Sequence, residues 1–156
     1  MNIFQSAGMN RPKKNKFDLS HEKKLSMNMG DLVPILLQEI VPGDSFRVNS
    51  EIMIRLAPML APIMHRVNVY THYFFVPNRL LWDEWQDFIT GGREGNLNPV
   101  PPKFVVDPTK DAQLFKKGTI WDYFGLPPFT PSTVASTLEV SSLPFRAYQL
   151  IYNDLS

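Results

Sequence analysis

Residues 42–92, with the sequence PGDSFRVNSEIMIRLAPMLAPIMHRVNVYTHYFFVPNRLLWDEWQDFITGG, carry the strongest structural signal in this chain. Residues 44–56 and 66–76 alternate between two faces with a period of two, which is the pattern of a β-strand. We therefore expect two strands, joined by the apolar segment 57–64, in which two prolines leave room for a short helical turn. The predicted core is the set of side chains on one face of both strands: Phe46, Val48, Ile52, Ile54, Val67, Val69, Tyr73 and Phe75.

Shorter signals flank the two strands. Residues 31–40 predict an edge strand or an irregular extended segment, and residues 41–44 (VPGD) predict a type II turn. A helix is expected over residues 82–92, because apolar residues recur there at helical spacing, Asn78 is available as its cap and Gly91 can end it.

The last third of the chain predicts loops and two further helical segments. Residues 93–131 are rich in proline and predict loops, except for one helical turn over residues 119–124. Residues 143–153 predict a helix with Ser142 as its cap. Across all 156 residues there are 14 prolines against 8 glycines. Proline cannot donate to a β ladder, so the strands should be short and separated by long loops.

Aromatic side chains are concentrated on the predicted helices and on the loops between them. Trp, Tyr and Phe are enriched at protein interfaces and also anchor cores. We expect nine of them to act as packing anchors or as subunit contacts: Trp82, Trp85, Phe88, Trp121, Tyr123, Phe129, Phe145, Tyr148 and Tyr152.

The charge of the chain is unevenly distributed. Its formal net charge is +1, but the first thirty residues hold six basic side chains against two acidic ones. A basic segment ahead of a mildly acidic body is typical of an arm that meets a polyanion, although such an arm can also remain solvated. The candidate nucleic-acid contacts on this arm, residues 1–29, are Arg11, Lys13, Lys14, Lys16, Lys23 and Lys24.

Enzymatic signals are missing from the sequence. There is no P-loop, dinucleotide-binding, nucleophile-elbow or zinc-protease motif. The acidic residues Asp83, Glu84 and Asp87 predict a solvated helix face, and His65 and His72 are too far out of phase to share a metal. There is no cysteine, so no disulfide or thiolate site is expected. We predict no catalytic residue, no metal site and no cofactor.

Five pieces follow one another along the chain: Gly43 to Phe46, Arg55 to Pro58, Val69 to Pro77, Trp82 to Gly92 and Leu143 to Asn153. Together they resemble the major capsid protein of the Microviridae, the small single-stranded DNA phages, and in particular its gokushovirus branch. The resemblance runs from about residue 19 to residue 153, whereas family members are several times longer. We therefore expect an N-terminal portion of such a protein or the product of a truncated gene.

This resemblance implies a mainly β fold, part of a viral jelly-roll barrel or sandwich with a few short helices and long proline-rich loops. The implied organisation is the basic arm, followed by residues 30–156 as the N-terminal part of one jelly-roll domain with a loop insertion at about 93–142. The implied function is a capsid subunit that assembles in the bacterial cytoplasm into an icosahedral shell around single-stranded DNA. The implied partners are further copies of the chain, the genome and a small basic packaging protein, without membrane insertion. The alternative is a β-sandwich carbohydrate-binding module, because jelly rolls serve both purposes.

Overall fold

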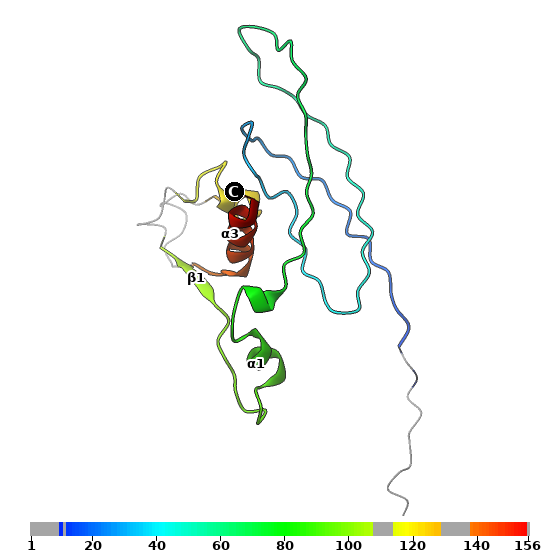
Figure 1. The fold of residues 1–156 in the computed structure, drawn as a ribbon, viewed down its shortest axis with the longest axis vertical. Helices are drawn as coiled ribbons and strands as arrows, with labels where there is room; N and C mark the ends of the chain where they lie inside the picture. The colour runs from blue at the N-terminus through cyan, green and yellow to red at the C-terminus, as the bar shows by residue number, and fades with distance from the viewer. Residues whose placement is uncertain (1–9, 11, 108–113, 129–137, 156) are drawn as a thin grey trace, which may run out of the picture.

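The computed structural model describes residues 10, 12–107, 114–128 and 138–155. The chain divides into an extended half, residues 12–77, and a packed half, residues 78–155 (Figure 1). In the extended half the backbone runs up and down in long irregular stretches, and every assigned helix and strand of the described residues lies in the packed half. These elements are η1 (Asn78–Leu80), α1 (Trp85–Thr90), β1 (Lys103–Val106), α2 (Ile120–Tyr123), β2 (Leu138–Ser141) and α3 (Leu143–Leu155).

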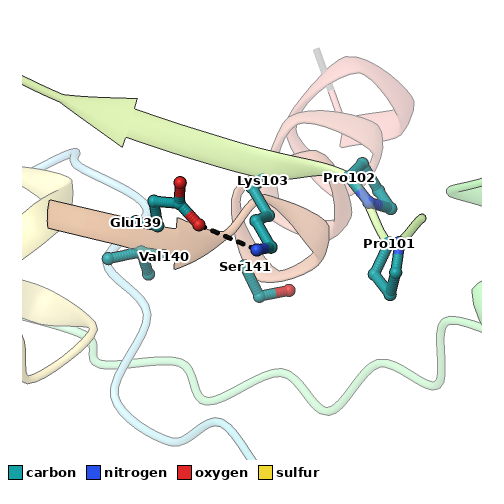
Figure 2. Close-up of a pocket in the computed structure, with 6 residues that line it drawn as sticks. All are labelled: Pro101, Pro102, Lys103, Glu139, Val140 and Ser141. Carbon is teal, nitrogen blue, oxygen red and sulfur yellow. Dashed lines mark hydrogen bonds and ion pairs between the residues drawn. The ribbon is translucent and has the colours of Figure 1, made fainter.

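Strands β1 and β2 form an antiparallel two-stranded ribbon. Lys103 pairs with Ser141, and Val106 pairs with Leu138 at the other end. Val106 is fully buried, whereas Lys103 and Glu139 form an ion pair of 2.8 Å on the outer face (Figure 2). Both charged side chains are about half exposed, so this pair contributes at most about 1 kcal/mol. The inner face therefore holds the ribbon to the rest of the molecule.

A small aromatic core lies under this ribbon. Val106, Phe115 and Trp121 are buried together, and the rings of Phe115 and Trp121 meet edge to face at 4.7 Å. The Trp121 indole N–H donates to the Pro127 carbonyl at 2.9 Å, so burial leaves its one polar group satisfied. Around these three side chains pack Leu126, Leu138, Val140 and Phe145.

Helix α3 and its cap residue Ser142 form side-chain hydrogen bonds to three parts of the chain that are distant in sequence. The Arg146 guanidinium donates to the Leu81 carbonyl at 2.9 Å, and the Tyr148 hydroxyl donates to the Leu32 carbonyl at 2.8 Å. The Ser142 hydroxyl donates to the Pro102 carbonyl at 3.1 Å. All three acceptors are main-chain carbonyls outside regular helices and strands, where a buried acceptor needs a partner from elsewhere. We call these three bonds the α3 anchors.

The predicted helices and turn are confirmed, with differences at their ends. Helix α1 ends at Gly91, whose φ of +77° is the left-handed conformation that favours glycine. The turn at 41–44 closes with a bond of 3.1 Å from the Asp44 N–H to the Val41 carbonyl. Helix α1 begins only at Trp85. Asn78 does not cap it, because Asn78 is instead the first residue of the short 3-10 helix η1, where its carbonyl accepts the N–H groups of Leu81 and Trp82. The hydroxyl of Ser142 turns to Pro102 as described above.

The prediction of strands over residues 44–56 and 66–76 is wrong, because the structure has irregular extended backbone there. No strand is assigned in residues 12–102, the segment 57–64 contains bends without a helical turn, and residues 31–40 are irregular. The eight predicted core side chains are all exposed: Phe46, Val48, Ile52, Ile54, Val67, Val69, Tyr73 and Phe75. The alternating pattern is present in the sequence, but an apolar face is buried only when an opposing layer exists. Among the described residues no such layer lies against these two stretches.

The ribbon, in turn, falls in the region predicted to be loop. Strand β1 lies within residues 93–131, and β2 lies within the segment predicted as part of a loop insertion at 93–142. The sequence signal for β2 was its alternation of apolar and polar residues. Leu138 and Val140 are half-buried in the structure, whereas Glu139 and Ser141 are exposed. Four residues are too few for a period of two to stand out against the surrounding polar sequence.

The α3 anchors predict that Tyr148→Phe loosens the segment around Leu32. Loss of a hydrogen bond of this kind costs about 1 kcal/mol, so trypsin should cleave after Lys23 and Lys24 roughly fivefold faster. Tyr152→Phe, on the same helix, is the matched control and should leave the rate unchanged. Equal rates for Tyr148→Phe and the unaltered chain would contradict the anchoring role.

The same bond predicts a dependence on alkaline pH. Burial, then the nearby Tyr152 and Asp31, raise the pKa of Tyr148 above its usual 10.0. The protonated phenol is therefore favoured in the folded chain, and its stabilisation is complete below about pH 10 and lost as the pH rises through the raised pKa. An absorbance titration of the phenolates should therefore show one fewer tyrosine ionising above about pH 10 in Tyr148→Phe than in the unaltered chain. The same late ionisation in both chains would contradict the raised pKa of Tyr148.

Candidate functional site

Three aromatic side chains gather around the start of α1. The Trp82 ring lies 6.4 Å from Trp85 and 5.4 Å from Phe88, and Trp85 and Phe88 lie 5.8 Å apart. Trp82 is buried together with Leu81, while Phe88 remains partly exposed. These predicted anchors therefore pack against one another within the chain, and the rim of the group is open to a neighbour.

A second line of aromatic rings joins α2 to α3. Phe145 lies 6.1 Å from Trp121 and 5.0 Å from Phe124, and Phe124 lies 6.4 Å from Tyr148. The line continues to Tyr152, whose side chain is 52% exposed. Sequence reasoning missed Phe124 as an anchor, although it is the last residue of the predicted helical turn. Another predicted anchor, Phe129, lies outside the described residues.

Where the structure describes it, the basic arm contacts the packed half around Tyr123. The Tyr123 hydroxyl donates to the Ser26 carbonyl at 2.9 Å. The Lys23 ammonium donates to the carbonyls of Tyr123 and Pro34. Desolvation lowers the pKa of Lys23, and the negative charge of Asp122 partly opposes this effect. Lys23, predicted to contact nucleic acid, is thus held in a contact with protein.

The other basic residues of the arm are available to solvent. Lys13, Lys14, Lys16 and Lys24 are exposed on extended backbone, and Arg11 lies outside the described residues. The backbone around them contains no helix or strand. These side chains can therefore follow the shape of a flexible polyanion without breaking structure.

The residues with catalytic potential are dispersed. Asp83, Glu84 and Asp87 are exposed, and so are His65 and His72. No group of three His, Asp or Glu side chains suited to a metal ion occurs within the described ranges. In the same part of the chain, every helix is too short or too polar to cross a membrane.

Comparison with known proteins identifies relatives of the whole chain. The family described as capsid protein (F protein) matches residues 4–155. Capsid protein VP1 of Chlamydia phage 1 is 40% identical over 146 residues, which cover 91% of this chain and 24% of that protein. Capsid protein VP1 of Bdellovibrio phage phiMH2K is 39% identical over 141 residues, covering 90% of this chain and 25% of the relative.

A more distant relative is capsid protein F of Escherichia phage G4, which is 29% identical over 143 residues that cover 88% of this chain and 28% of that protein. The chain spans about a quarter of the length of the curated relatives it matches. No solved structure matches it. The relatives bear the names of structural proteins of phages, as the sequence resemblance predicted. Because the match extends over nearly all of its residues, the chain belongs to the capsid protein (F protein) family of the Microviridae.

Proposed function

We propose that this chain forms part of a major capsid subunit that self-assembles into an icosahedral shell around a single-stranded DNA genome. The observation that carries the proposal is the 40% identity to a phage capsid protein across 91% of the chain. In this proposal the protein acts in the virion, assembles in the host cytoplasm and has no enzymatic activity.

The exposed apolar faces of the extended half support a role in assembly. Residues 44–56 and 66–76 hold eight apolar or aromatic side chains on one face, and the isolated chain leaves them open. A soluble protein rarely exposes so much contiguous apolar surface unless another protein covers it. We propose that further strands of the capsid subunit, together with neighbouring subunits, complete a jelly-roll layer over these faces. Residues 30–156 would then be the N-terminal part of that jelly-roll domain.

The arm supports contact with the genome. Lys13, Lys14 and Lys16 lie within four residues of one another and are exposed. Lysine neutralises DNA phosphates by releasing counterions, and an unstructured arm can do so for any base sequence. A small basic packaging protein would share this neutralisation, so it is a further proposed partner inside the shell.

The carbohydrate-binding alternative finds no fully exposed tryptophan among the described residues. Such a module holds sugar on exposed Trp and Tyr side chains, but Trp82 and Trp121 are buried and Trp85 is partly covered. The Tyr123 and Tyr148 hydroxyls donate to carbonyls of the chain itself. The tryptophans of the chain are therefore occupied by packing, and the aromatic side chains left open for a sugar would be Tyr70, Tyr73 and Tyr152.

The arm is tested by replacing Lys13, Lys14 and Lys16 with alanine in the protein as the phage produces it. Binding to single-stranded DNA should weaken, and the slope of log K against log salt should decrease by about 0.7 for each lost phosphate contact. The matched control replaces Arg93, Lys116 and Lys117, which removes the same charge from the packed half. If both triple variants show the same slope as the unaltered protein, the arm is not a DNA contact.

The open apolar faces predict that residues 1–156, expressed alone, do not behave as a stable monomer. Unpaired apolar stretches invite association between chains, and the small core offers little to offset the entropy of ordering the long loops. Light scattering should detect aggregation, and calorimetry should show a broad melt. A sharp two-state transition from a dilute monomer would contradict the proposal that these faces await cover.

A further inference from the structure

Three exposed aromatic rings stand in a row on the extended half. The rings of Tyr70 and His72 lie 6.5 Å apart with an angle of 31° between their planes, and those of His72 and Phe74 lie 6.1 Å apart at 24°. The Tyr70 side chain is 74% exposed, and the other two side chains are also exposed. Because every second residue points the same way, they share one face of the stretch 66–76. We call these three residues the aromatic row.

The two faces of the extended half differ in charge. The hydroxyls of Ser50 and Tyr73 lie 3.3 Å apart, which places the apolar faces of residues 44–56 and 66–76 on the same side. That side carries no charged residue between residues 46 and 56 or between residues 67 and 75. The opposite side holds the aromatic row together with three arginines and one glutamate: Arg47, Arg55, Arg66 and Glu51.

We propose that the face carrying the aromatic row is a binding site for single-stranded nucleic acid, with unpaired bases stacking on Tyr70, His72 and Phe74 and phosphates meeting the arginines. The inference rests on the proposed function, since it names the surface of the subunit that meets the packaged genome. Stacking on aromatic rings tolerates any base sequence, because every base has a π-face. A shell that encloses a whole genome requires that tolerance.

The spacing of the row suits this ligand. Neighbouring ring centroids lie 6.5 and 6.1 Å apart, and their planes differ by 31° and 24°, so successive rings present similarly oriented faces on which bases can stack. A base pair in a duplex offers no free face to such a row, so the site should select single strands.

A protein partner fits this face less well than it fits the opposite one. A protein layer covering the row would desolvate Arg47, Arg55 and Arg66, and charged residues are depleted at the centres of protein interfaces. The only acidic side chain on this face is Glu51. The uncharged opposite face is the one suited to a protein layer, which leaves the arginine face for a polyanion.

Photo-crosslinking to the unaltered protein tests the site without relying on a variant. A bromodeoxyuridine-substituted single strand should crosslink within residues 67–79, which trypsin releases as one peptide between Arg66 and Arg79. Fragmentation of that peptide should place the bond on Tyr70, His72 or Phe74. Crosslinks confined to Tyr73 and Phe75, or an absence of crosslinks from this peptide, would overturn the proposal.

Binding measurements with paired variants supply the second test, using the protein as the phage produces it and a labelled oligothymidine strand. Tyr70→Leu with Phe74→Leu should weaken binding by roughly tenfold for each lost ring, without changing the salt slope, because stacking involves no phosphate. Tyr70→Phe with Phe74→Tyr keeps both rings, so it is the matched control and should retain the affinity. Arg47→Gln with Arg66→Gln should reduce the slope by about 0.7 for each arginine that meets a phosphate.

Electron microscopy of the same preparations separates this inference from the proposed function. Particles that form and hold DNA, combined with equal affinities for the row variants and their control, would overturn the binding site alone. If the unaltered protein forms no shells at all, the proposed function itself is overturned, whatever the affinities of the variants.

Discussion

The packed half of this chain depends on hydrogen bonds that α3 and its cap residue give to other segments. Arg146, Tyr148 and Ser142 donate to the carbonyls of Leu81, Leu32 and Pro102, respectively. A larger protein would satisfy such carbonyls in sheet ladders, but the described residues contain one ladder of four residue pairs. The side-chain donors take over that function, and each fixes a loop at a defined place on the helix. Helix α3 therefore positions loops whose own backbone groups form few hydrogen bonds with one another.

The aromatic side chains supply the cohesion that accompanies these anchors. Rings of α2 and α3 meet from Trp121 through Phe145 and Phe124 to Tyr148, and the Trp121 ring also closes the core with Phe115. Large rings bury much area for few residues, which suits a segment interrupted by prolines. The packed half is thus small but specific.

The extended half combines a strand-like sequence with an irregular backbone. Its alternating sequence is that of strands, yet the backbone between residues 12 and 77 contains none. Family membership explains the conflict, since the chain spans about a quarter of the length of its relatives. We infer that the pattern is selected for a layer completed by other segments. We propose that the uncharged face meets protein and that the arginine-bearing face meets the genome.

The sequence by itself determined the local features and the family. Helices α1, α2 and α3, the turn at 41–44 and the end of α1 at Gly91 were predictable because their hydrogen bonds join residues a few positions apart. The uneven charge and the ordered capsid-like pieces were readable because both depend only on the order of the residues. Only the tertiary structure decided the pairing of β1 with β2, the burial of Phe115 and Trp121, and the α3 anchors. Those contacts join residues far apart in sequence, and alternation alone does not show which partner, if any, a strand-like segment will meet.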